Sequence, residues 1–223
     1  MWSDYPFLYA SLGLGVVLAL YLLLTGAPFR FLLVVGLINA PTGALEVFFI
    51  PEYWSPNRIL PFIIGIEDLL FSGVVGIVAW ILAFGRDLSK LQLPGGVTRT
   101  FLRFLLVLSI YVVGFALLKT SGLRVMPAAV AALTAVGIGL ALVRLDLFCY
   151  ALRGAALFAA VYFVFLRTSY WIWPHWIDEW NLEALWDLVI FGVPAEEIVW
   201  AFFYGGVSPL ATGYILKVIP PRQ

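Results

Sequence analysis

The chain has 223 residues, of which 63% are hydrophobic and 12% are charged, and its mean hydropathy is +1.03. A soluble domain averages about 45–50% apolar and about 25% charged residues, so the composition excludes an ordinary soluble domain and indicates a polytopic membrane protein. The formal net charge is zero, and the chain has one cysteine and one histidine. These counts give no reason to expect a nucleic-acid partner, a disulfide framework or a histidine-ligated metal centre.

Apolar runs long enough to cross a bilayer recur along the chain. A membrane-spanning helix needs about 20 mainly apolar residues. The runs are continuous and do not alternate, so the predicted fold class is an all-α membrane protein and not a β-barrel. We predict seven transmembrane helices, over residues 6–24, 29–49, 61–84, 101–118, 127–143, 147–166 and 188–215.

The positions of lysine and arginine predict the orientation of these helices. If the N-terminus lies outside, four of the 13 basic residues fall at outer helix ends and the others at cytoplasmic ends. The four are Arg58, Lys119, Arg124 and Arg167. Because basic residues favour the cytoplasmic side, we expect an integral protein of the cell (inner) membrane with its N-terminus outside and its C-terminus inside.

Two of the predicted helices carry adjacent acids within apolar runs. Glu67 and Asp68 lie in GIEDLLFSG (65–73), and Glu196 and Glu197 lie in VPAEEIVWAFF (193–203). A carboxylate in mid-membrane costs roughly 2.5 to 3.5 kcal/mol on insertion scales, which about six apolar residues offset. We therefore expect both pairs to face the bundle interior and to have a function. Hydrogen bonds between helices or contacts with a helix dipole are the alternative.

The surroundings of the two acid pairs indicate an internal repeat. An aromatic loop precedes each pair, IPEYW (50–54) in the first half and WPHWI (173–177) in the second. We predict one membrane domain over residues 1–223, with parallel three-helix repeats at about 6–84 and 127–215 and a connector helix at about 101–118. The tryptophans of the second loop, Trp171, Trp173, Trp176 and Trp180, are predicted to form an interfacial aromatic belt.

Glu46, near the end of the second predicted helix, adds a fifth acid. We expect the acid pairs to lie about two turns inside their helices, so that all five acids share the outer half of one bundle. Neighbours on a helix point about 100° apart, so the members of each pair should face different partners. Carboxyls close together in a low dielectric cannot all ionise, and at least one should keep the proton that a general acid needs.

Aromatic residues accompany the acids at helical spacing. Phe71 follows Glu67 by four residues and Trp200 follows Glu196 by four, which places each ring on the face of its acid. An acid beside an aromatic face, with no good nucleophile nearby, suits carbocation chemistry. The acid protonates an alkene, and the ring stabilises the cation by about 2 kcal/mol or more when desolvated. Such a substrate would be an apolar alkene dissolved in membrane lipid.

At these residues the sequence resembles the integral-membrane lycopene cyclases of the archaeal, fungal and heterodimeric bacterial type. Their repeated signature is similar to PAEEIVWAFF (194–203) and, in a degenerate form, to GIEDLLFSG. PTGALE (41–46) is a loose counterpart of a further family motif, with Glu46 at its acid position. The first copy departs from the pattern at Gly65, Asp68 and Ser72, and the second has Trp200 in place of the first phenylalanine.

The resemblance implies a lycopene β-cyclase activity in carotenoid biosynthesis. The reaction is an acid-initiated, redox-neutral cyclisation of a linear polyene end to a β-ionone ring, formally that of an intramolecular lyase or isomerase. No glycine-rich dinucleotide motif occurs in the sequence, which fits a cofactor-free reaction. The implied catalytic residues are Glu46, Glu67, Asp68, Glu196 and Glu197. The implied substrate-binding residues are Phe71, Trp200 and Phe203.

Two other functions remain open from the sequence. One is a proton-coupled membrane carrier of a small hydrophobic substrate, since acids within membranes also relay protons. The other is a retinal-binding seven-helix photoreceptor, for which the last helix offers only Lys217 as a Schiff-base lysine. The sequence leaves the oligomeric state open, as well as the number of substrate ends that react.

Overall fold

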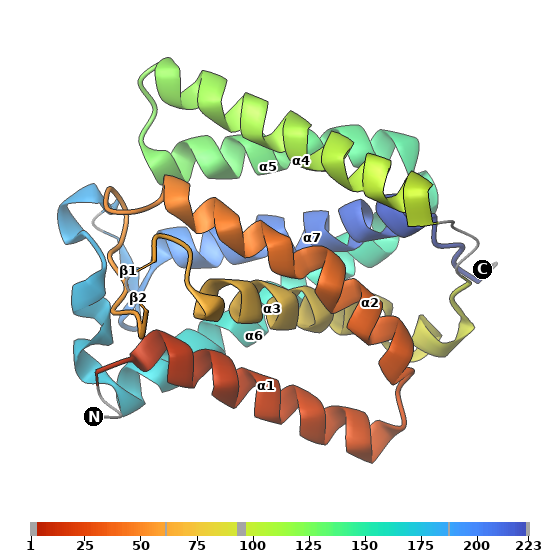
Figure 1. The fold of residues 1–223 in the computed structure, drawn as a ribbon, viewed down its shortest axis with the longest axis horizontal. Helices are drawn as coiled ribbons and strands as arrows, with labels where there is room; N and C mark the ends of the chain where they lie inside the picture. Colours follow the sequence, from red (N-terminus) through yellow and green to blue (C-terminus); the bar gives the residue numbers. More distant parts are fainter. Residues whose placement is uncertain (1–3, 61, 93–96, 187, 222–223) are drawn as a thin grey trace. The chain divides into compact units, whose positions relative to one another are not determined.

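The computed structural model describes residues 4–60, 62–92, 97–186 and 188–221. In this part of the chain, seven helical segments are long and apolar enough to cross a membrane, which confirms the predicted number (Figure 1). The α-helices are α1 (Pro6–Thr25), α2 (Phe29–Asn39), α3 (Ile66–Phe84), α4 (Val97–Thr120), α5 (Val125–Val143), α6 (Phe148–Ile172) and α7 (Ala195–Leu216). Five 3₁₀ segments lie between them, η1 (Ala40–Phe48), η2 (Gly85–Lys90), η3 (Leu145–Leu147), η4 (Pro174–Glu179) and η5 (Leu182–Ala184).

The second membrane segment changes from α-helix to 3₁₀ helix at Ala40, where α2 meets η1. Pro41 has no backbone N–H to donate, and its ring would clash with the preceding turn of an α-helix. The Asn39 side chain donates to the carbonyl of Val35 over 2.8 Å, and Thr42 Oγ1 donates to the carbonyl of Asn39 over 2.7 Å. Both side chains thus add hydrogen bonds to backbone carbonyls close to the change of helix type.

The structure corrects the predicted starts of two helices. Helix α3 begins at Ile66, whereas the prediction began at residue 61; Pro61 itself lies outside the described residues. Helix α7 begins at Ala195 and not at Leu188, because the strands β1 (Val189–Ile190) and β2 (Val193–Pro194) form an antiparallel hairpin before it. The turn residues Phe191 and Gly192 both have positive φ, 50° and 87°, as a two-residue hairpin turn of type I′ requires.

These later starts also move the acid pairs. Glu67 and Asp68 lie in the first turn of α3, and Glu196 and Glu197 lie in the first turn of α7, so the expected depth of two turns was wrong. The amino end of a helix carries partial positive charge, and acids there are stabilised by the helix dipole. Both pairs therefore occupy equivalent places in their helices.

The chain divides into two compact units, each built from segments that are distant in the sequence. The first unit comprises Met1–Val78 and Ala160–Ile198, and the second comprises Ala79–Ala159 and Val199–Gln223. The division falls within α3, α6 and α7. The predicted pair of parallel repeats follows different boundaries and stays a prediction.

The second unit is held together by close helix contacts. Helix α4 packs along α5 (Figure 1). The Gly114 position faces the Cβ of Ala132. Helices α6 and α7 approach closely at two glycines, since a Cβ on Gly205 would lie 2.8 Å from the carbonyl oxygen of Gly154. Arg144 donates to the carbonyls of Gly213 and Val218 and so satisfies acceptors at the end of α7.

Candidate functional site

Two loops of the first unit meet through their backbones and build one end of the site. We call residues 49–65, before α3, the first loop, and residues 173–194, between α6 and α7, the second loop. Trp54 and Trp180 form an isolated antiparallel bridge, and the N–H of Asn181 donates to the carbonyl of Tyr53 over 2.8 Å. The two aromatic loops that the sequence placed before the acid pairs therefore lie together.

Glu197 accepts hydrogen bonds from three side chains of the first unit. Its Oε1 accepts hydrogen bonds from the Tyr53 hydroxyl (2.8 Å) and from Trp180 Nε1 (2.9 Å). Its Oε2 accepts from the Tyr162 hydroxyl of α6 (3.0 Å). Burial, and then the nearby Glu197 carboxylate, raise the pKa of Tyr53 well above its usual value, so this phenol stays a donor. Both loops and α6 thus fix the orientation of one carboxylate.

Glu196 faces a different partner from Glu197, as the helical spacing predicted. Its Oε1 accepts a hydrogen bond from the backbone N–H of Trp186 in the second loop. Its Oε2 is buried and has no hydrogen-bond partner among the described residues. The residue is only 1% exposed, so this oxygen is available to a group that enters the protein and is shielded from bulk water.

Glu67 has the same combination of burial and an unused oxygen. It is 1% exposed, and its Oε1 has no hydrogen-bond partner in the described part of the chain. Its carboxyl group folds back over Gly65, where an added Cβ would lie 2.6 Å from the Glu67 Cδ. The glycine at the position where the second copy has Pro194 therefore makes room for this carboxyl group.

Asp68 also has a buried oxygen, Oδ1, without a hydrogen-bond partner among the described residues, but its other oxygen is held by local partners. Its Oδ2 forms a 2.6 Å ion pair with Arg58 and accepts a 2.8 Å hydrogen bond from the N–H of Gly65. The second contact is one half of a capping box, in which the third helical residue reaches back to the N-cap. Arg58 also donates to the carbonyls of Phe62 and Ile63. Asp68 and Arg58 together hold the end of the first loop against α3.

Glu46 completes the group of five acids, all of which belong to the first unit. It is half-buried in η1, and its Oε2 accepts a 2.9 Å hydrogen bond from Trp54 Nε1. It also lies within electrostatic range of Asp68 and Glu197. The expectation that Glu46 joins the two acid pairs in one cluster is therefore met within this unit.

An aromatic cluster lies beside the acids. Phe71 is buried and contacts Phe7 (ring centroids 5.3 Å apart) and Tyr162 (6.4 Å). Phe7 in turn meets the edge of Trp54 at 4.9 Å. These contacts give the acids apolar, π-rich surroundings in which a charge on one of them is poorly solvated by water.

The other two predicted substrate-binding residues belong to the second unit. Trp200 stacks on Tyr204 with ring centroids 4.9 Å apart, and Phe203 meets the ring of Phe202 at 5.6 Å. Trp200 remains one helical turn after Glu196 in α7. The prediction that its ring shares the face of Glu196 stays a prediction.

Sequence reasoning did not assign the residues that donate to the acids. These residues are Tyr53, Trp54, Arg58, Tyr162 and Trp180. The aromatic-belt interpretation was wrong for Trp176 and Trp180, which are 3% and 7% exposed, whereas Trp171 is 76% exposed and fits it. The sequence feature that could have identified these donors is the aromatic loop that precedes each acid pair.

The buried acids and the aromatic residues around them indicate the class of protein. The chain is an integral membrane protein whose first unit encloses buried carboxylates within an aromatic shell, and this combination can transfer protons to and from an apolar substrate. Among the described residues, no group of three or more His, Cys, Asp or Glu side chains is placed to hold a metal ion.

A comparison with protein families finds a match over part of the chain. Residues 124–215 match the family model described as Lycopene cyclase, so the resemblance found in the sequence is confirmed for this segment. The matched segment runs from the start of α5 to the last turn of α7 and contains Glu196, Glu197 and two donors to Glu197, Tyr162 and Trp180. No curated protein and no solved structure matches the chain significantly.

Proposed function

We propose that this protein is a lycopene β-cyclase-like enzyme of carotenoid biosynthesis. The observation that carries the proposal is the pair Glu67 and Glu196, each 1% exposed and each with one carboxyl oxygen that no described residue uses. A buried carboxyl with a free oxygen beside aromatic rings is suited to protonate an alkene. The family match over residues 124–215, which includes Glu196, supports the same chemistry.

The proposed reaction begins with proton transfer from the Glu196 carboxyl group to the terminal double bond of a linear polyene end. A C–H bond forms, the adjacent double bond closes the ring through a new C–C bond, and a tertiary cation remains. Glu67 then removes a proton from the ring, which restores a double bond and leaves a β-ionone end group. One proton enters and one leaves, so the step needs no oxidant or reductant.

The other acids are proposed to stabilise the cation, and the aromatic rings are proposed to contact the polyene chain. Glu197, held by three donors, is assigned the role of a fixed carboxyl group that stabilises the developing positive charge. Glu46 lies within electrostatic range of Glu197, and Asp68 positions the start of α3 through Arg58. Phe71, Trp200 and Phe203 are the residues proposed to contact the polyene. A ring face stabilises a desolvated cation by about 2 kcal/mol or more.

The membrane supplies the substrate in this proposal. A polyene of this kind is apolar and dissolves in the hydrocarbon core, so it approaches laterally through lipid and not from water. The predicted orientation places the N-terminus outside, which would put the acid cluster in the outer half of the bilayer.

The test is expression of the full chain in bacterial cells that accumulate lycopene, followed by pigment analysis. Cyclised carotenoid is the expected product. Glu196→Gln should abolish it at unchanged membrane insertion, whereas Glu183→Gln, at an exposed residue of η5, should leave it unchanged. Pure lycopene in cells with a well-inserted wild-type chain would contradict the function, and full activity of Glu196→Gln would contradict the assigned role.

A further inference from the structure

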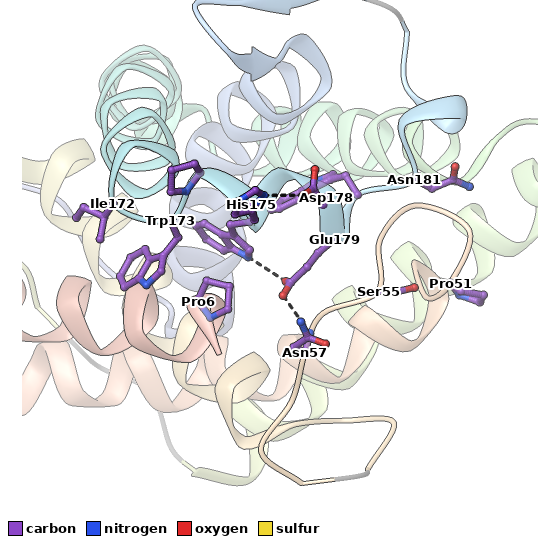
Figure 2. A pocket seen from close by; sticks show the side chains of 13 residues that line it. Pro6, Pro51, Ser55, Asn57, Ile172, Trp173, His175, Asp178, Glu179 and Asn181 are labelled. Carbon is purple, nitrogen blue, oxygen red and sulfur yellow. Dashed lines mark hydrogen bonds and ion pairs between the residues drawn. The ribbon is translucent and has the colours of Figure 1, made fainter. Parts of the chain in front are cut away.

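A pocket of about 640 Å³ lies at the loop end of the first unit (Figure 2). Its wall includes His175, Asp178 and Glu179 from η4, Pro6 from α1 and Asn57 from the first loop. The side chains of His175 and Asp178 are 96% and 66% exposed. The pocket therefore meets the aqueous phase at these two residues.

Glu179 occupies the inner wall of this pocket and is half-buried. Its Oε2 accepts a 3.0 Å hydrogen bond from Trp176 Nε1, and its Oε1 accepts a 3.3 Å hydrogen bond from the N–H of Asn57 (Figure 2). Burial raises the pKa of Glu179 to about 7, so this carboxyl group gains and loses a proton near neutral pH. The titratable groups around it are His175 and Asp178 in the pocket and Tyr170 of α6.

Tyr170 packs against two tryptophans of the pocket wall, Trp176 and Trp180, and Trp180 also donates to Glu197. Tyr170 is 7% exposed, and its hydroxyl is buried with no hydrogen-bond partner among the described residues. Its ring meets the edges of Trp176 and Trp180 at 5.6 and 5.7 Å, and it lies within electrostatic range of both Glu179 and Glu197. A buried hydroxyl without a hydrogen-bond partner costs about 1–3 kcal/mol of folding free energy. A functional role for this hydroxyl would explain why the protein carries that cost.

Tyr162 extends the series toward the acid cluster. It stands two turns before Tyr170 in α6, lies within electrostatic range of it, and donates to Glu197 over 3.0 Å. Glu179, Tyr170, Tyr162 and Glu197 thus form a succession of proton-carrying groups within one unit, from an open pocket to the buried carboxylates. Bridging waters are needed to pass a proton between Tyr170 and its neighbours in the succession, because no direct hydrogen bond joins them among the described residues.

We propose that Glu179 and Tyr170 are the route by which protons pass between the aqueous phase and the buried acid cluster. The inference rests on the proposed cyclase function, because that reaction turns over one proton at the buried acids in each cycle. The proton that Glu67 removes from the ring leaves along this route, and an equivalent proton enters along it to restore the proton that Glu196 gave to the alkene. Protons and electrons balance, since the cycle consumes neither.

The test measures proton exchange without any substrate. The full chain is placed in lipid bilayers, transferred from H₂O to D₂O, and the carbonyl stretching band of protonated carboxyl groups is followed by infrared spectroscopy. The band is assigned to the buried cluster by its loss in Glu67→Gln or Glu196→Gln. Glu179→Gln and Tyr170→Phe should each slow its exchange by about tenfold or more.

Asp178→Asn is the matched control, since this neighbour lines the same pocket and should exchange at the wild-type rate. Exchange at the wild-type rate in either Glu179→Gln or Tyr170→Phe would overturn the route. The absence of any carboxyl band that depends on Glu67 or Glu196 would overturn it too. Tyr170→Phe removes only a hydroxyl without a partner among the described residues, so it provides a readout even if Glu179→Gln folds poorly.

The outcome is separable from that of the pigment test. Slow exchange in both variants together with no cyclised carotenoid would support the proton route and reject the cyclase assignment. Cyclised carotenoid together with unchanged exchange would support the cyclase assignment and reject the proton route.

Discussion

Trp180 Nε1 in the second loop donates a 2.9 Å hydrogen bond to Oε1 of Glu197, in the first turn of α7. The same oxygen accepts a hydrogen bond from Tyr53 of the first loop. One buried carboxylate therefore ties both loops to α7. The two loops and the acid cluster should respond together when any of these three residues is changed.

Replacing Trp180 with phenylalanine tests this link. The change keeps an aromatic ring but removes the donor, and the loss of one hydrogen bond to a buried acid costs about 1–3 kcal/mol of folding free energy. Thermal unfolding in detergent should show the loss, and yield of cyclised carotenoid should fall by about tenfold. Trp171→Phe is the control, because Trp171 is 76% exposed and should behave as the wild type. Equal stability of the two variants would contradict the link.

The number of membrane helices was predictable from the sequence for a simple physical reason. A run of apolar residues must be long enough to cross the hydrocarbon core whatever its tertiary contacts, so seven runs predict seven helices. Glu46 and the two acid pairs were predictable as a group on the same ground, because acids are costly in lipid and tend to gather inside. All five do lie in one compact unit.

The partners of the acids could not be predicted in the same way. Tyr53, Trp180 and Arg58 lie in loops, and a loop residue faces a particular acid only through contacts made far away in the sequence. Trp180 in particular has the composition signal of an interfacial residue, yet a bridge to Trp54 turns it inward. The start of α7 was misplaced because residues 188–194 are as apolar as a helix and form a hairpin instead.

Arg58 offers a second prediction, since it neutralises a buried acid. Its side chain is 8% exposed and that of Asp68 is 0% exposed. Arg58→Met leaves the Asp68 carboxylate buried without its counter-charge, and breaking such a pair costs about 3–5 kcal/mol. The single variant should lose thermal stability in detergent. Arg58→Met combined with Asp68→Asn should recover part of it, and a double variant less stable than the single one would argue against the pairing.

Gly43 sets how closely η1 approaches α3. A Cβ at this position would collide with the backbone carbonyl of Asp68, which cannot move independently of its helix. Gly43→Ala should destabilise the protein by about 1–3 kcal/mol, as measured by thermal unfolding. Gly13→Ala in α1 is the control, because nothing lies within 4 Å of its added Cβ, and it should be neutral or stabilising by about 1 kcal/mol or less. If Gly43→Ala is as stable as Gly13→Ala, η1 does not depend on this close approach.

Glu179 predicts a specific dependence of stability on pH. Its pKa is about 7 in the folded chain and 4.5 in an ordinary glutamate, so folding increases its affinity for a proton. The stability that this provides is complete below about pH 4.5 and is lost as the pH rises through about 7. Thermal unfolding of the full chain in detergent should therefore weaken over this interval, and Glu179→Gln should flatten that slope. Asp178→Asn, at an exposed neighbour, should keep the wild-type slope; a slope of equal size in Glu179→Gln would assign the effect to another group.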